Sequence, residues 1–155
     1  MKSRYAALFC AVFLTSAATS PAQSAEEQAV LATVQRVFEG MRTSDSAMVR
    51  SAFDPGARFA GVDSTGTVRY QALDGWIRAI ANSAGRWEEP LYDIQVRVDG
   101  TMAQVWAPYT FYFDKKVRHC GVDTFELLRT PNGWKITQLS DTQRRTGCPD
   151  PLKRG

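Results

Sequence analysis

Two short stretches in the C-terminal third of the chain carry the residue types that could do chemistry. The first runs from His119 to Asp123 and contains the only histidine of the sequence, and the second runs from Asp141 to Cys148. An imidazole titrates close to neutral pH, carboxylates and arginines can pair with it or with a ligand, and two cysteines can form a disulfide. These residues locate a candidate site, but they do not name a reaction.

The alternation of side chains along a β-strand decides which of these residues can share a site. A strand over residues 117–129 places His119, Asp123 and the apolar Phe125 on one face and Cys120 on the other. Phe125 marks the first face as buried, so His119 and Asp123 are predicted to point toward the same interior. Four residues of strand separate them by about 13 Å, too far for a direct hydrogen bond. A partner for either group must come from a neighbouring strand.

The turn at residues 130–133 suggests a register for the strand that follows. In this register Asp123 lies opposite Ser140, and Arg144 lies near His119. An arginine there would disfavour the imidazolium form of the histidine. Asp141 falls on the other face of the sheet unless a bulge shifts it.

General acid–base catalysis is the sharpest hypothesis that these residues support. Asp123 or His119 would abstract a proton, and Tyr109, predicted to point inward, would donate a hydrogen bond to the developing oxyanion. An apolar cavity raises the pKa of a carboxyl toward neutrality, as such a base requires. The structural alternatives are a hydrogen-bonding role for His119 and an ion pair between Asp123 and Arg144 or Arg145, because a buried unpaired carboxylate is costly.

A wider set of side chains could contact a ligand without taking part in chemistry. Aromatic residues at such positions are more often part of the core, and the polar ones could instead cap the end of the sheet. The candidates for ligand contact are Trp106, Phe111, Phe125, Arg144 and Asp141.

The N-terminal residues have the composition of a secretory signal peptide. Lys2 and Arg4 precede an apolar run at 6–18, and small residues at 22–25 offer cleavage sites. The run has about 13 residues, whereas a bilayer-spanning helix needs about 20. We therefore predict a signal peptide over residues 1–24 and a periplasmic or secreted protein without a membrane segment after cleavage.

Removal of the signal changes the charge and the cysteine count. Loss of Lys2 and Arg4 reduces the 19 basic residues to 17 against 16 acidic ones, so the formal charge falls from +3 to +1. With no long basic helix, this balance argues against nucleic acid as a partner. Cys10 leaves as well, so Cys120 and Cys148 remain in an oxidising compartment and are predicted to form a disulfide. One histidine and two cysteines fall short of a zinc site, and we predict neither a metal nor a cofactor.

The predicted elements come in the order helices first and strands after them. Ser24 and Glu27 form a capping box for a helix of about four turns, and the turn residues at 55–56 end a second, short helix. Pro108 requires an edge position or a bulge in its strand, because it has no amide to donate. The other expected elements are a hairpin at 57–62 and 67–70, a third helix from 73 to about 84, and strands at 92–98, 102–113, 117–129 and 134–142.

This order predicts an α+β fold in which a curved antiparallel sheet wraps around the N-terminal helices. About 130 mature residues suffice for one domain. We expect that domain to span residues 25–148 and to be followed by a flexible basic tail at 149–155.

Four short motifs are distributed over this domain, at residues 53–59 (FDPGARF), 103–113, 120–125 (CGVDTF) and 133–136 (GWKI). With the order of elements, they resemble the nuclear transport factor 2-like (NTF2-like) superfamily, and within it the SnoaL-like and DUF4440-type bacterial proteins. The resemblance covers about residues 26–145 and implies a cone-shaped, cystatin-like sheet around a long helix, with an apolar cavity and often a dimer. Members include isomerases, cyclases, dehydratases, epoxide hydrolases and binding modules, so the fold does not choose a function. No catalytic motif of the family matches this chain position by position.

Three functions are compatible with these observations. The preferred one is a secreted domain whose apolar cavity binds a small molecule, without established turnover. The alternative is a lyase or isomerase that acts on a small apolar substrate by acid–base catalysis. The third is a dimeric interaction module without catalysis, in which Val122, Trp106 and Tyr112 would form a hydrophobic surface on the outer face of the sheet, whereas Thr124 and Glu126 would keep that face polar in a monomer.

Overall fold

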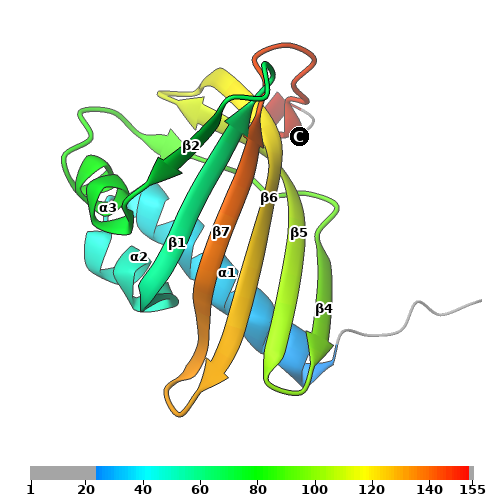
Figure 1. The fold of residues 1–155 in the computed structure, drawn as a ribbon. Helices are drawn as coiled ribbons and strands as arrows, with labels where there is room; N and C mark the ends of the chain where they lie inside the picture. The colour runs from blue at the N-terminus through cyan, green and yellow to red at the C-terminus, as the bar shows by residue number, and fades with distance from the viewer. Residues whose placement is uncertain (1–23, 154–155) are drawn as a thin grey trace, which may run out of the picture.

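The first helix begins where the capping residues predict. The structure, a computed structural model, describes residues 24–153. α1 spans Ala25–Thr43, and the Ser24 hydroxyl and the Glu27 carboxylate each accept a hydrogen bond from the other residue's amide. Figure 1 shows α1 lying along one face of the sheet. The apolar residues that it buries are Val30, Val34, Val37 and Met41.

Two shorter helices follow, with a hairpin between them. α2, Ser46–Ala52, is capped by the Asp45 carboxylate, and α3 spans Leu73–Ala81. The sequence placed the end of the second helix at 55–56, but the chain passes directly from α2 into a strand at Phe53. The pairing of that strand shifts register between Phe53 and Arg58, and the Pro–Gly pair lies in this irregular stretch. A break in the ladder thus accommodates the two residues that were expected to form a turn.

Seven strands form one curved sheet in the order β2-β1-β7-β6-β5-β3, with β4 also paired to β5. The pairing of β1 with β7 is parallel and every other pairing between these strands is antiparallel, so the sheet is mixed. The predicted α+β fold with N-terminal helices against a curved sheet is confirmed. The strands are β1 Phe53–Asp63, β2 Val68–Gln71, β3 Trp87–Glu88, β4 Gln95–Asp99, β5 Met102–Phe113, β6 Lys116–Thr130 and β7 Gly133–Gln143, and a 3-10 helix, η1 Pro151–Lys153, follows them.

Pro108 lies in the middle of β5, where the ladder with β6 continues without a bulge. Its carbonyl accepts a hydrogen bond from the Tyr92 amide, and the Thr110 amide donates to the Pro90 carbonyl. The nitrogen and carbonyl of one residue in an antiparallel strand point to the same side. The Pro108 nitrogen therefore faces the stretch between β3 and β4, a local edge of the sheet where no strand requires its hydrogen bond.

One extra residue in β7 changes the register that the sequence suggested. Leu127 lies opposite Ile136, but Glu126 already pairs with Gln138, so Thr137 is left over as a bulge. A single extra residue reverses which side chains of a strand reach each face. Every residue of β7 after this point is displaced relative to the predicted pairing.

The bulge brings Asp141 to the inner face of the sheet. Asp123 lies opposite Asp141 and no longer opposite Ser140. Arg144 pairs with Cys120 across an isolated bridge, one position away from the predicted pairing with His119, and lines a surface hollow together with His119. The two predicted pairings failed for one reason, because the register was counted from the turn without the bulge.

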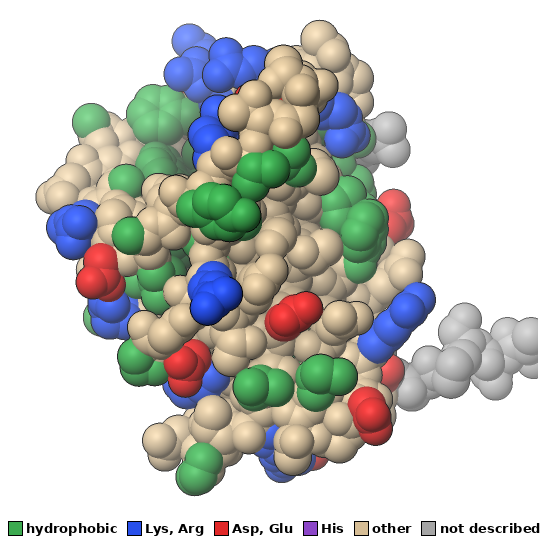
Figure 2. Space-filling view, in the orientation of Figure 1, with side chains coloured by type: hydrophobic (Ala, Val, Ile, Leu, Met, Phe, Trp, Pro, Cys, Tyr) green, Lys and Arg blue, Asp and Glu red, His purple; other side chains and the backbone are tan. Residues whose placement is uncertain are grey.

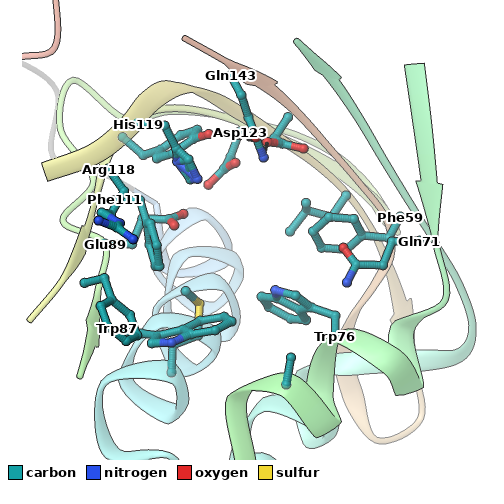
Figure 3. A pocket seen from close by; sticks show the side chains of 16 residues that line it. Phe59, Gln71, Trp76, Trp87, Glu89, Phe111, Arg118, His119, Asp123 and Gln143 are labelled. Carbon is teal, nitrogen blue, oxygen red and sulfur yellow. Dashed lines mark hydrogen bonds between the residues drawn. The ribbon is translucent and has the colours of Figure 1, made fainter. Parts of the chain in front are cut away.

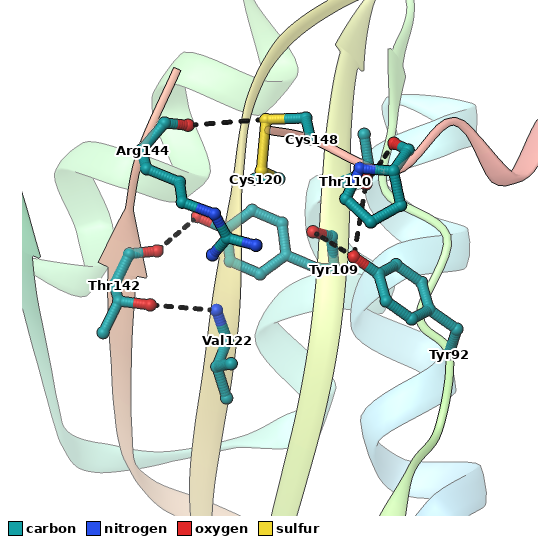
Figure 4. The surroundings of a disulfide bond; sticks show 9 residues. Tyr92, Tyr109, Thr110, Cys120, Val122, Thr142, Arg144 and Cys148 are labelled. Carbon is teal, nitrogen blue, oxygen red and sulfur yellow. Dashed lines mark hydrogen bonds between the residues drawn. A yellow bond between two sulfur atoms is a disulfide. The ribbon is translucent and has the colours of Figure 1, made fainter. Parts of the chain in front are cut away.

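The C-terminal segment lies across the outer face of the sheet (Figure 4). A disulfide joins Cys120 to Cys148, as predicted, with 5.5 Å between their Cα atoms. The Thr110 hydroxyl donates to a backbone carbonyl of this segment, and the Tyr112 hydroxyl donates to the Asp150 carboxylate over 2.7 Å. Residues 149 and 150, which begin the segment expected to be a flexible tail, therefore have defined partners on β5.

No helix within residues 24–153 is long and apolar enough to cross a membrane. The predicted signal peptide lies outside the described residues, apart from Ser24.

Candidate functional site

A cavity of about 400 Å³ lies between the inner face of the sheet, α1 and α3 (Figure 3). Aromatic rings form much of its wall. Phe59 and Trp76 make one pair, with ring centroids 5.2 Å apart, and Trp87 and Phe111 make another at 5.5 Å. Figure 3 shows the two pairs on opposite sides of the cavity. Such a lining suits a flat, largely apolar molecule.

Polar side chains gather at the end of the cavity formed by β5, β6, β7 and the segment after β3. Two of them are acids that the bulge in β7 has placed opposite each other. Asp123 is only 3% exposed and Asp141 8% exposed. The polar residues at this end are Glu89, Tyr109, His119, Asp123, Asp141 and Gln143.

Glu89 is a member of this cluster that sequence reasoning missed. It follows the two-residue strand β3, whose pairing with the end of β5 brings the segment against the sheet. The isolated bridge between Leu91 and Tyr109 holds the segment on its other side. Strand pairings so short leave no periodic pattern in a sequence, and Glu89 precedes a proline in what reads as a loop. The residue as a whole is half-buried, but its carboxyl group is enclosed.

The Glu89 and Asp123 carboxyls lie within hydrogen-bonding reach of each other. Asp123 Oδ2 is buried and has no donor among the described side chains and amides. Two carboxylates cannot bond to each other unless one carries a proton, so the contact requires a shared proton. Burial raises the pKa of Glu89 to about 8, and burial followed by the charge of Glu89 raises the pKa of Asp123 well above its usual range. The pair therefore holds a proton near neutral pH.

The arginine that was considered as a partner for Asp123 is not there. None of the ion pairs among residues 24–153 includes Asp123. Arg144 is drawn away to the bridge with Cys120 by the register of β7, and Glu89 occupies the place of a partner. The structural ion pair with Arg144 or Arg145 is thus excluded.

Tyr109 reaches the polar end from β5, as its predicted inward orientation requires. Its hydroxyl donates to the Thr142 carbonyl over 3.0 Å and lies 3.3 Å from Asp141 Oδ2. Gln143 donates to the same carboxylate oxygen over 2.8 Å. Burial, followed by the charge of Glu89, raises the pKa of Tyr109. The phenol therefore stays protonated, with its hydrogen directed at β7.

The pKa of Asp141 is also raised, by burial, while the bonds from Gln143 and Tyr109 oppose the shift. Gly61 of β1 lies opposite this residue, and a Cβ at Gly61 would come within 2.5 Å of Asp141 Oδ1. The glycine leaves the room that the Asp141 side chain occupies.

His119 is packed as an aromatic side chain as well as a polar one. Its ring lies 4.8 Å from that of Phe111 and 5.7 Å from that of Tyr109. Nδ1 is buried and has no hydrogen-bond partner among the described residues. Burial and then the charge of Arg145 lower the pKa of His119, so the imidazole is neutral at physiological pH. His119 and Asp123 line one cavity without bonding to each other, as the strand geometry predicted.

The candidates for ligand contact separate into two groups. Phe111 and Asp141 line the cavity. Trp106 lies on the outer face with half of its surface exposed, because its parity in β5 is opposite to that of Tyr109. Phe125 is buried in the core against Phe38. Trp106 and Phe125 thus lie on the faces that strand parity predicted but do not line the cavity, and Arg144 lines a surface hollow at the end of β7.

Comparison with known proteins gives a family and a set of folds. Residues 30–141 match the family model of the SnoaL-like domain. A protein of unknown function with a cystatin-like fold from Nostoc punctiforme superposes with a TM-score of 0.64 at 10% identity, over 84% of this chain and 97% of that one. No curated protein matches the chain.

Two further solved structures carry names that mention an activity. The "putative dehydratase from the NTF2-like family" of Streptomyces avermitilis has a TM-score of 0.60 at 20% identity, over 76% of this chain and 95% of that one. The "putative aromatic ring hydroxylase" of Novosphingobium aromaticivorans has a TM-score of 0.60 at 20% identity, over 80% and 90%. At these identities the likeness establishes the fold and no activity.

Proposed function

The chain belongs to the SnoaL-like domain family, and we propose that its cavity binds a small, largely apolar molecule. The observation that carries this proposal is an aromatic cavity of about 400 Å³ lined by the buried Asp123, whose Oδ2 has no hydrogen-bond partner among the described residues. An apolar wall with a few convergent polar groups is typical of small-molecule sites. The rings supply affinity, and the polar end supplies orientation.

Binding can be tested with N-phenyl-1-naphthylamine, an uncharged fluorescent probe of suitable size. We expect saturable fluorescence enhancement, and a loss of affinity of about tenfold in Trp76→Ala, which removes a cavity wall. Trp106→Ala is the matched control, because Trp106 is exposed on the outer face. Circular dichroism would verify that both variants fold. Equal losses in the two variants, or no binding by the wild type, would contradict the proposal.

Proton transfer on the bound molecule is a second candidate function, favoured by the pair of carboxyls that shares a proton. Glu89 has a pKa of about 8, so the pair can give or take a proton near neutral pH. In this scheme the Glu89–Asp123 pair is the base once its shared proton has left, and Tyr109 and His119 are neutral groups beside it. Tyr109 would donate to an oxyanion only after leaving the Thr142 carbonyl.

The test for proton transfer is exchange of carbon-bound hydrogen in deuterated water. A ketone that displaces the probe, such as 1-indanone, would lose an α-proton to the ionised Glu89–Asp123 pair and regain a deuteron from the same pair after it has exchanged with solvent. Replacing a general base should slow this exchange by about 100-fold or more in Asp123→Asn. Exchange at equal rates in the wild type, the variant and buffer would leave binding as the only function.

Export from the cytosol is proposed as the setting of this function. It is supported by the signal-like N-terminal sequence and by the disulfide between Cys120 and Cys148. Mass spectrometry of the protein recovered from the cell envelope tests export. We expect the residues before about position 25 to be missing, and an intact N-terminus would contradict export.

A homodimer through the outer face of the sheet is also a proposal. Figure 2 shows this face with hydrophobic side chains in small separate areas between charged ones. Trp106 is half exposed there, but Tyr112 is buried beneath the C-terminal segment and cannot join a dimer surface. Light scattering should show a dimer that Trp106→Glu dissociates, and a monomeric wild type would contradict the proposal.

A further inference from the structure

The polar end of the cavity holds more acid than its surroundings neutralise. Glu89, Asp123 and Asp141 all line it, and none forms an ion pair with a lysine or arginine among the described residues. Arg118 lines the cavity too, but it is exposed and its guanidinium lies 5.7 Å from the centroid of the Phe113 ring. His119 is held neutral by burial. The cluster therefore lacks a positive charge.

A second, independent observation points to a ligand at this place. Only 3% of the surface of Asp123 is exposed, and its Oδ2 has no hydrogen-bond partner among the described residues. The two aromatic pairs, Phe59 with Trp76 and Trp87 with Phe111, stand on either side of the space in front of the acids (Figure 3). Ring faces attract cations through their quadrupole, most strongly when water is excluded.

We propose that the molecule bound in this cavity is a small organic cation, with an apolar body against the aromatic walls and a quaternary or protonated amine beside Asp123 and Glu89. This inference rests on the proposed binding function and names its ligand class. The amine would supply the positive partner that the three acids lack, and the aromatic rings would contact its alkyl groups. An anionic ligand would instead meet the negative charge that the proton-sharing Glu89–Asp123 pair still carries.

Binding of such a cation should release a proton from the protein. The Glu89–Asp123 pair keeps a proton only because no positive charge is near, and a bound cation favours the fully ionised pair. Affinity should then rise with pH, up to about tenfold for each unit below the pKa of the pair. Other titratable or charged groups surround the pair. From the sheet these are Asp141, Tyr109, His119 and Arg118, and on the far side of Glu89 they are Glu39, Arg42 and Glu88. The cavity-lining residues of α3 include none, and Arg69 and Arg145 act from further away.

The experiment compares three probes of one shape and different charge. Benzyltrimethylammonium is a permanent cation, neopentylbenzene is its uncharged isostere, and 3-phenylpropanoate is an anion of similar size. Each would compete with N-phenyl-1-naphthylamine for the full mature protein at pH 6 and pH 8. At pH 8 we expect the cation to bind about tenfold more tightly than the isostere, and between pH 8 and pH 6 its affinity should fall by about 50-fold. The isostere should show no pH dependence.

Variants locate the effect. Asp123→Asn and Glu89→Gln should each reduce the affinity for the cation by about tenfold. The affinity for the isostere should stay within about twofold of the wild-type value. Glu126→Gln, on the exposed outer face of β6, is the charge-matched control and should change neither. Two separate variants are used so that misfolding of one does not decide the result.

The possible outcomes separate this inference from the function on which it rests. Equal affinity for the cation and its isostere, or tighter binding of the anion, would overturn the cation while leaving an apolar ligand site in place. Failure of all three probes and of the fluorescent probe to bind a folded protein would overturn both. Calorimetry in two buffers with different ionisation heats should find about one proton released per cation bound, and none released would contradict the coupling.

Discussion

Asp123 shows how far the sequence leads at the scale of one residue. Its place on the inner face followed from strand parity and from Phe125 two residues on, and the structure confirms it. Its partner did not follow, because Glu89 is 34 positions away in the chain and sits beside a strand of two residues. Local periodicity predicts the direction of a side chain, but the contact depends on how separate segments pack.

The shared proton makes a prediction about stability. The folded-state pKa values of Glu89 and Asp123 are raised, so between about pH 4 and pH 8 the folded protein binds protons that the unfolded chain releases. Stability should therefore fall as pH rises through this window, by roughly 2 to 4 kcal/mol for the pair. Asp123→Asn removes one of the two acids and offers Glu89 an amide donor. We expect the variant to be more stable than the wild type at pH 8, by roughly 1 to 3 kcal/mol, and its stability to vary less with pH.

Urea denaturation of both proteins at pH 5 and pH 8 measures this difference. Glu126→Gln serves as control, since Glu126 is exposed and should leave the pH dependence of the wild type unchanged. A variant as sensitive to pH as the wild type would show that the pair does not hold a proton in the folded state.

At the scale of the element, the strands and helices were largely predictable and their register was not. Alternation of apolar and polar residues identified the long strands, and the Ser24–Glu27 capping box identified the start of α1. The bulge at Thr137 leaves no such signature, because threonine suits a bulge and a regular strand equally. This one residue decides whether Asp141 points into the cavity. Candidate sites on adjacent strands therefore need the register as well as the parity.

Gly121 is the residue on β6 that allows the displaced β7 to come close. A Cβ at this position would overlap the carbonyl of Thr142, which also accepts the Tyr109 hydroxyl. Gly121→Ala should push the strands apart and destabilise the protein by roughly 2 kcal/mol or more. It should also release the tyrosine from its acceptor.

Gly75→Ala is the matched control for this substitution. Gly75 lies in α3 with no atom near the position of a Cβ, so alanine there should stabilise the helix by up to about 1 kcal/mol. Chemical denaturation of the two variants gives both values. If both substitutions changed the free energy of unfolding equally, the close approach of β7 to Gly121 would not contribute to stability.

For the molecule as a whole, the C-terminal segment couples the chain end to the back of the site. The disulfide attaches it to Cys120, on the strand that carries His119 and Asp123 on its other face, and Asp150 accepts a hydrogen bond from Tyr112. The sequence predicted the disulfide from the count of cysteines, but it did not predict what the segment covers. The basic charge near the end suggested a flexible tail, whereas the buried hydroxyls of Thr110 and Tyr112 require the partners that the segment supplies.

The disulfide should contribute strongly to global stability. The crosslink joins residues 28 apart, and closing a loop of that size stabilises a fold by roughly 3 to 4 kcal/mol. Cys148→Ser should lose about this amount, and reduction of the wild type should lose the same, while reductant should leave the variant unchanged. Tyr112→Phe removes the hydroxyl that bonds to Asp150 and to the Leu152 backbone, and should cost about 1 kcal/mol. This variant separates the crosslink from the contacts of the segment. Wild-type protein without residues 1–24, once denatured, should contain no free thiol. Two free thiols, together with undiminished stability in Cys148→Ser, would show that the segment is held without the disulfide.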